Sequence, residues 1–255
     1  MVDRSKIGVL TYCCNICGAS CESKVNDLGR ETPSCAQCGS TVRMRAMIHL
    51  LSQALFGRGI ALFDFPIRKD IRGIGLSDWI GYAAPLAQKL NYTNTFYHQE
   101  PRLDITDIDP SLEETLDFLI ATDVFEHIAP PISVAFENSH KLLKPTGVFI
   151  LTVPYGKDAE TQEHFPELFQ YKISEREGKR LLKNITRDGR EQIFEHLKFH
   201  GGDGATLEMR LFSEPALLKE LAQAGFREVK IHGEPDWVHG IYWMHDWSLP
   251  IVASK

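Results

Sequence analysis

The chain has 255 residues, with 43% hydrophobic and 24% charged side chains, which is ordinary for a globular protein with a sizeable core. Its formal net charge of −6 argues against a large surface for nucleic-acid phosphates, so nucleic acid is not an expected partner. No apolar run approaches the roughly 20 residues that span a bilayer, and the first residues lack the apolar core of a secretory signal. We therefore expect a cytoplasmic protein without a membrane partner.

All six cysteines lie in the N-terminal segment, between positions 13 and 38. They include two matching Cys-x-x-Cys-Gly motifs, and clustered cysteines in a cytosolic protein favour a metal over disulfides. Two such motifs present four thiolates at tetrahedral spacing, which predicts a structural zinc ribbon, whereas a redox dithiol explains only one of them. The expected zinc ligands are Cys14, Cys17, Cys35 and Cys38. Cys13 and Cys21 are then spare, although either could replace Cys14 or Cys17 as a ligand.

The next elements are a helix and three short strands. Apolar residues at helical spacing predict a helix from Thr41 to Phe56 that is ended by Gly57. Arg43 and Arg45, at its start, could contact an anion, but we favour solvated side chains. Apolar runs then predict strands at Ile60–Phe65, Gly73–Leu76 and Phe96–His98.

The middle of the chain contains two apolar runs, Phe118–Ala121 and Val148–Val153, that have no polar face. Such runs fit strands that are covered on both sides of a parallel sheet. The segment between them has helical spacing and begins at Pro130-Pro131, so the three elements form one crossover unit. Its first strand ends at Thr122 and Asp123, and sheets of this kind bind ligands at the carboxyl ends of their strands.

The last third of the chain begins with residues 157–204, which are polar and charged and fit no strand of a core sheet. Leucines at helical spacing then predict a helix at Glu214–Ala224. Two apolar runs, Phe226–His232 and Leu249–Ala253, predict the last two strands.

The motifs LDIT, DFLIATDVFEHI and LLKPTGVFILTVP, in this order and spacing, resemble the central motifs of the class I S-adenosylmethionine-dependent methyltransferases. The resemblance covers residues 41–255 and implies an α/β fold with a Rossmann-like, seven-stranded, mostly parallel sheet that ends in an antiparallel hairpin. It divides the chain into a zinc ribbon at residues 1–41 and a methyltransferase domain at residues 42–255. Residues 157–204 would be an inserted substrate-binding region.

The resemblance also implies where the cofactor would bind. A subgroup with N-terminal zinc ribbons has a short apolar-Pro pattern in place of the usual glycine-rich loop after the first strand, and Phe65-Pro66 fits it. In the family, an acidic residue after the second strand binds the ribose hydroxyls, because a carboxylate accepts hydrogen bonds from both, and this position points to Asp78. A later position of the family contacts the adenine, and Asp104 and Ile105 match it. The expected cofactor-binding residues are Phe65, Pro66, Asp78, Asp104, Ile105, Thr122 and Asp123.

Transfer of a methyl group to a hydroxyl or carbon acceptor needs a general base, and histidine titrates in the suitable range. We rank His196 first and His127 second as this base, with His164 and His200 as rivals. The expected enzyme methylates a small molecule, with a sugar or glycan precursor favoured by the resemblance, and its cofactors are S-adenosylmethionine and zinc. Two alternatives stay open: a zinc-ribbon protein directed to nucleic acid, and a methyltransferase-like scaffold without catalysis, which the glycine-poor loop favours.

Overall fold

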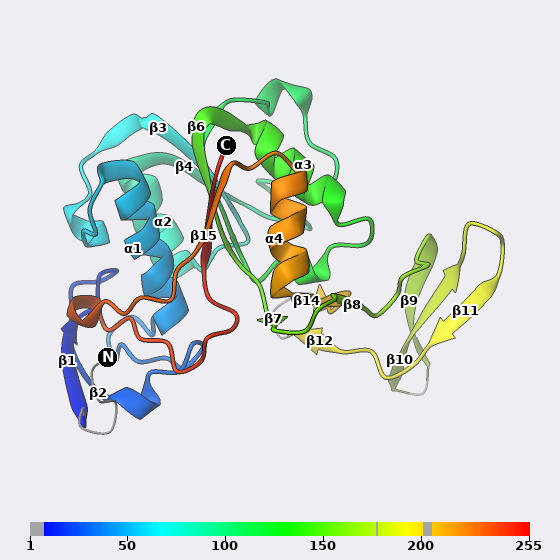
Figure 1. Cartoon of the computed structure of the whole chain (residues 1–255), viewed down its shortest axis with the longest axis horizontal. Coiled ribbons are helices and arrows are strands. Elements are labelled where there is room, and N and C mark those ends of the chain that lie inside the picture. The colour runs from blue at the N-terminus through cyan, green and yellow to red at the C-terminus, as the bar shows by residue number, and fades with distance from the viewer. Residues whose placement is uncertain (1–7, 177, 201–205) are drawn as a thin grey trace.

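The computed structural model describes residues 8–176, 178–200 and 206–255, and its centre is a mixed sheet (Figure 1). Within these residues the sheet has the spatial order β15 (Glu228–Ile231), β16 (Ile251–Ser254), β6 (Leu143–Thr152), β5 (Leu116–Thr122), β3 (Arg68–Leu76) and β4 (Leu90–Thr95). The last four are parallel, whereas β16 runs antiparallel to both β6 and β15. This mostly parallel sheet with a terminal antiparallel hairpin confirms the predicted class I, Rossmann-like fold.

Helices cover both faces of the sheet (Figure 1). They are α1 (Val42–Phe56) and α2 (Ile80–Lys89) on one face, and α3 (Ser133–Leu142) and α4 (Glu214–Gln223) on the other. Alternate residues of β5 point to the two layers: Phe118 and Ile120 join the core with α1 and α2, and Leu119 and Ala121 join the core with α3 and α4. Burial on both faces explains why this strand has no polar side.

The sequence signals for the helices correspond to observed contacts. Thr41 caps α1 by accepting a hydrogen bond from the Met44 backbone N–H, and Gly57 ends the helix with a left-handed φ of 70°. Ser213 caps α4 in the same way, through the Ala216 backbone N–H. The predicted crossover unit is confirmed as β5, α3 and β6.

The first half of the sheet differs from the prediction. Residues 60–65 are not a strand but contain the short 3₁₀ turn η3 (Leu62–Asp64). The first strand is instead β3, of which Gly73–Leu76 is only the end, and the second strand, β4, was missed. The predicted strand at Phe96–His98 is reduced to a single bridge between Phe96 and Arg102, so the described part of the main sheet has six strands rather than seven.

The N-terminal segment packs against the rest of the molecule. It consists of the hairpin β1 (Val9–Cys13) and β2 (Ser20–Lys24), the turn η2 (Val25–Asp27) and a loop that leads into α1. Arg45 of α1 is fully buried, lies over the Tyr12 ring at 4.9 Å and donates to backbone carbonyls of Ser40, His239 and Gly240. The expectation of a solvated Arg45 was therefore wrong: its guanidinium ties the cysteine-rich segment to the C-terminal part of the chain.

The segment between β6 and α4 forms small sheets of its own. One contains β7 (Tyr155–Gly156), β14 (Arg210–Ser213) and β8 (Gln162–Glu163); another contains β11 (Glu191–Phe194), β10 (Lys179–Ile185) and β9 (Gln170–Arg176); the third pairs β12 (Phe199–His200) with β13 (Thr206–Leu207). The β9–β11 sheet projects away from the body of the molecule (Figure 1).

Among the described residues, none of the helices has the length and apolar character that a bilayer span needs. The remaining short 3₁₀ turns are η4 (Pro110–Leu112), η5 (Phe125–His127) and η6 (Trp237–His239).

Candidate functional site

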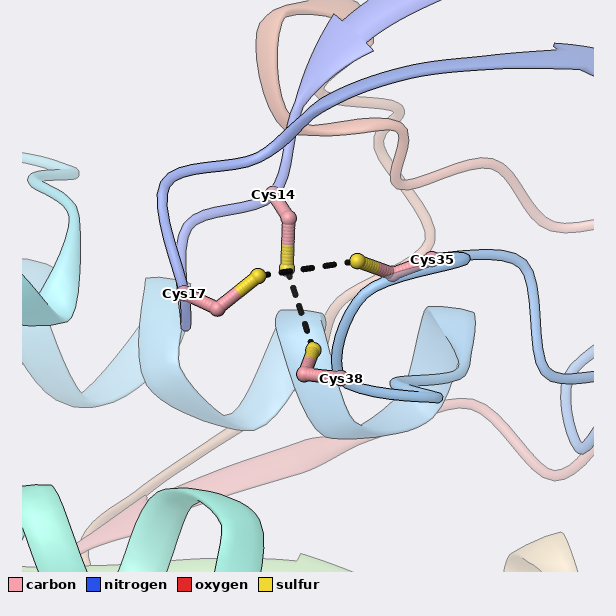
Figure 2. Close-up of side chains that lie close together, drawn as sticks. All are labelled: Cys14, Cys17, Cys35 and Cys38. Atoms are coloured by element: carbon pink, nitrogen blue, oxygen red, sulfur yellow. Dashed lines mark hydrogen bonds between the residues drawn. The ribbon is translucent and has the colours of Figure 1, made fainter.

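The four predicted zinc ligands converge. Cys14 and Cys17 follow β1, Cys35 and Cys38 precede α1, and Figure 2 shows their side chains pointing toward one another. The four sulfurs lie within 4.8 Å of each other, with Cys14 and Cys38 at 3.7 Å and Cys17 and Cys35 at 3.6 Å.

Each cysteine pair is held by a tight turn. The Gly18 and Gly39 backbone N–H groups return to the Cys14 and Cys35 carbonyls, with φ values of 81° and 74° at the two glycines. Glycine is needed there because other residues rarely adopt this left-handed conformation. Four thiol side chains at this spacing are the donor set that a structural zinc ion requires.

A second site lies at the carboxyl end of the parallel strands, where Thr122 ends β5 and Asp123 follows it, and where Ser77 and Asp78 follow β3. Ser77 and Asp123 have left-handed φ values of 57° and 54°, although neither is glycine. Non-glycine residues held in this way concentrate at functional sites, because the surrounding structure must impose the conformation.

Asp78 is buried in this edge, with 4% of its surface exposed. The Tyr92 hydroxyl donates to its carboxylate at 2.6 Å, and the Asn94 side chain bonds both its backbone N–H and its carbonyl at 2.8 Å. Loss of solvent raises the pKa of Asp78 to about 7, although the Tyr92 hydrogen bond opposes the rise. Gly75 makes this packing possible, because a Cβ there would lie 2.0 Å from the Tyr92 hydroxyl oxygen.

The predicted role of Asp78 depended on the wrong strand. Asp78 follows β3, the first strand, and β4, the second strand, ends at Thr95. The reason for assigning it to the ribose is therefore wrong, whereas its place at the carboxyl edge keeps it a candidate for cofactor binding. The glycine-poor loop at Phe65-Pro66 was likewise attributed to the wrong position, because those residues precede the first strand.

Asp123 forms ion pairs with two arginines of the N-terminal third of the chain. Arg30 donates two hydrogen bonds to its carboxylate, at 2.7 and 2.9 Å, and Arg43 lies 3.3 Å away. Burial opposes ionisation of Asp123, but the two guanidinium groups outweigh it and lower its pKa to about 2. Arg43 also pairs with Glu31 at 2.7 Å, so the expectation of a solvated Arg43 was wrong as well.

The other predicted cofactor residues have different surroundings. Asp104 is half-buried and accepts from the backbone and hydroxyl of Thr106, and Ile105 is buried with its carbonyl bound by Asn138. Phe65 is buried against Phe56, whereas Pro66 is exposed. Phe65 thus belongs to the packing around α1, and both residues precede the amino end of β3 rather than following its carboxyl end.

A cluster of histidines and carboxylates lies beside this edge. His127 of η5 donates from Nδ1 to the Leu207 carbonyl, 3.0 Å away, and its ring meets the His200 ring edge to face at 5.2 Å between centroids. Burial lowers the pKa of His127. Glu208 joins the cluster, with one oxygen 2.6 Å from His200 Nε2 and the other 2.9 Å from His164 Nε2.

The structure does not bring the first-ranked base, His196, into this cluster. His196 is an exposed residue with a φ of 58°, on the segment that joins β11 to β12. Its neighbours in sequence, Lys198 and His200, do reach Glu208, at 2.9 and 2.6 Å. Sequence reasoning missed Glu208 and Arg30, since no motif distinguishes either of them from other charged surface residues.

Comparison with known proteins finds no matching family model and no matching curated protein. Solved structures that resemble the chain include the Burkholderia thailandensis 1,6-didemethyltoxoflavin-N1-methyltransferase, with 17% identity, coverage of 83% of this chain and 77% of that chain, and a TM-score of 0.44. A sugar N-methyltransferase from Streptoalloteichus has 12% identity, coverage of 84% and 87%, and a TM-score of 0.46. An amino pentose methyltransferase from Micromonospora echinaspora has 15% identity, coverage of 85% and 92%, and a TM-score of 0.45. Because all three TM-scores are below 0.5, the fold assignment rests on strand order and direction.

Proposed function

We propose that the chain is an S-adenosylmethionine-dependent methyltransferase that acts on a small molecule, with a sugar or glycan precursor as the favoured class. The observation that carries this proposal is the strand order, in which the antiparallel β16 stands between β6 and β15, combined with a polar carboxyl edge. Ligands of doubly wound sheets bind outside this edge.

The side chains at the edge fit the cofactor's chemistry. S-adenosylmethionine is a methyl donor that carries an ammonium, a carboxylate and two ribose hydroxyls, and Asp78 and Asp123 supply acceptors while Arg30 and Arg43 supply cationic donors. Arg30 and Arg43 pair with Asp123 within the protein. Binding of the cofactor would exchange these internal ion pairs for contacts with the ligand.

The acceptor is expected on the side of the histidine cluster. His127 follows β5, the strand that ends just before Asp123, and His164, His200 and Glu208 come from the segment between β6 and α4. This segment therefore contributes directly to the edge, which supports its proposed role in substrate binding. A buried histidine with a lowered pKa is neutral at physiological pH, as a group that accepts a proton from a hydroxyl must be.

A structural zinc ion held by the four cysteines completes the proposal. Thiolate ligands at all four coordination positions of the zinc ion leave no position for a substrate. The ion would therefore stabilise the N-terminal segment rather than take part in methyl transfer. The nucleic-acid alternative loses support, because Arg30, Arg43 and Arg45 are engaged within the protein instead of facing solvent.

Isothermal titration of the zinc-loaded protein with S-adenosylhomocysteine tests the cofactor assignment. We expect micromolar binding, a loss of at least about tenfold in Asp78→Asn, and no change in the control Asp107→Asn, whose side chain is exposed on a turn. Absence of binding by the wild-type protein would refute the enzyme assignment, and equal affinity in Asp78→Asn would remove Asp78 from the site. Methylated products from a panel of free and nucleotide-linked sugars would then test the acceptor class.

A further inference from the structure

Two side chains of the histidine cluster, together with the neighbouring Glu126, have the composition of a metal site. Glu126 and His127 belong to η5, which follows β5 after two residues, and His200 belongs to β12. One potential ligand atom from each lies within 4.8 Å of the other two. Two imidazoles and one carboxylate form a donor set that binds divalent transition-metal ions and leaves coordination positions open.

Glu126 points to a ligand because its buried side chain has no hydrogen-bond partner among the residues that the structure describes. Its side chain is 1% exposed, and neither of its carboxylate oxygens has a hydrogen-bond partner among the described residues. The closest cationic candidate, His127 Nε2, is 3.6 Å from Oε1, too far for a hydrogen bond. A buried carboxylate without a partner is costly, and a bound cation is one way to remove this cost.

The two histidines are held in place by other groups, as metal-binding histidines usually are. The Leu207 carbonyl lies 3.0 Å from His127 Nδ1, which leaves Nε2, the nitrogen that faces Glu126, available as a ligand. His200 is fixed by Glu208 at 2.6 Å, and Glu208 is itself held by His164 and Lys198, each at 2.9 Å.

The backbone also makes this arrangement rigid. The Met209 N–H donates to the Glu126 carbonyl at 2.8 Å, and the Glu208 N–H donates to the Lys198 carbonyl at 2.9 Å. These bonds attach the segment that carries Leu207 and Glu208 to η5 on one side and to the residues before β12 on the other. The three candidate ligands are therefore positioned before any ion binds.

We infer that Glu126, His127 and His200 bind a divalent transition-metal ion, separate from the zinc ion of the four cysteines. The ion would neutralise the Glu126 carboxylate and would lie beside the carboxyl edge of the sheet, because Glu126 and His127 closely follow β5. The site does not depend on the proposed methyl transfer. If that function holds, the ion would bind the acceptor hydroxyl and lower its pKa, so that His127 acts as a ligand rather than as the general base.

Titration of the zinc-loaded full chain with Mn²⁺, followed by the loss of the free-ion electron paramagnetic resonance signal, tests this inference. Mn²⁺ prefers oxygen and nitrogen ligands and does not compete well for thiolates, so it reports on the new site and leaves the cysteine site loaded. We expect one Mn²⁺ bound per chain, roughly 100-fold weaker binding in Glu126→Gln and His200→Ala, and roughly 10-fold weaker binding in Glu208→Gln. His196→Ala, on the same segment but exposed, is the matched control and should bind as the wild type does.

Thermal unfolding shows whether each variant is folded. Without Mn²⁺, Glu126→Gln should be about as stable as the wild type, because it replaces a buried carboxyl group that has no hydrogen-bond partner among the described residues and keeps the shape. Excess Mn²⁺ should raise the melting temperature of the wild type but not of Glu126→Gln. The inference is overturned if the wild type binds neither Mn²⁺ nor a second equivalent of Zn²⁺, or if Glu126→Gln and His200→Ala bind as the wild type does. Binding of S-adenosylhomocysteine is measured separately, so either proposal can fail alone.

Discussion

Asp78 should make the protein less stable as the pH rises. Its carboxyl has an ordinary pKa of 3.8 and a pKa of about 7 in the folded protein, because burial disfavours the charged form. Between these two values the unfolded chain has lost the proton while the folded chain retains it. The folded state thus binds more protons, and the free energy of unfolding falls with rising pH until the loss is complete above about pH 7.

The size of the effect follows from the same two pKa values. Each tenfold difference in proton affinity is worth about 1.4 kcal/mol, so a pKa raised from 3.8 to about 7 destabilises the ionised folded state by roughly 4 kcal/mol. Asparagine in place of Asp78 keeps the acceptor for the Tyr92 hydroxyl and cannot ionise. Asp78→Asn should therefore lack this dependence and become more stable than the wild type near neutral pH.

Urea unfolding of both proteins at several pH values between about 4 and 8 measures the effect. The difference between the two free energies of unfolding isolates Asp78, because all other titrating groups are shared. We expect the difference to change by roughly 4 kcal/mol across this range, in favour of the variant as the pH rises. A difference that stays constant with pH would show that Asp78 titrates near its ordinary value, and the reasoning from its burial would be refuted.

Two further substitutions test the packing at the edge and the cysteine site. Gly75→Ala places a Cβ 2.0 Å from the Tyr92 hydroxyl and 2.2 Å from the Asp78 carboxylate, so urea unfolding should show a loss of about 3 kcal/mol, whereas Gly8→Ala, which meets nothing within 4 Å, should be neutral. Unchanged stability of Gly75→Ala would mean that the loop after β3 moves aside. Cys35→Ser should lose the zinc equivalent in elemental analysis and lower the melting temperature, whereas the spare Cys13→Ser should retain both. Full zinc content in Cys35→Ser would show that another cysteine serves as the ligand.

The sequence predicts the parts of the fold where local signals and packing agree. The crossover unit β5–α3–β6 is confirmed because both of its strands are buried on two faces and so are apolar throughout. The four converging cysteines could be predicted for another reason, since the spacing within each motif nearly determines the local geometry. These features depend little on contacts that are distant in the sequence.

The first strand could not be identified from its residues in the same way. Residues 60–65 are apolar because Leu62 and Phe65 pack into the core around α1, and a buried turn of this kind looks like a strand in sequence. The real strand, β3, begins with charged residues and contains Gly73 and Gly75, both of which weaken a strand signal. Gly73 is nevertheless required, because the Phe118 ring of the neighbouring strand occupies the place of its side chain.

The histidine cluster could not be predicted from the sequence, because its members lie far apart in the chain and come together only in the fold. His127 comes from η5 and His164 from the segment before β9, whereas His200 lies in β12 and Glu208 directly after β13. They meet only through long-range contacts such as the hydrogen bond from Met209 to Glu126. His196 was ranked above His200 from its surroundings in sequence, yet only His200 faces Glu208. The proposed site therefore depends on long-range pairing that no local pattern reveals.

The ion pair between Arg30 and Asp123 joins residues that are 93 positions apart. A fragment that begins at α1 would thus be less stable than the full chain, because it would leave Asp123 without its Arg30 partner and expose apolar side chains of α1 that pack with the cysteine-rich segment. In a mutational scan, damaging positions should therefore appear in the first forty residues and at the sheet edge alike. Positions 30 and 123 should also covary among related sequences, because a substitution at one of them restricts which residues are tolerated at the other.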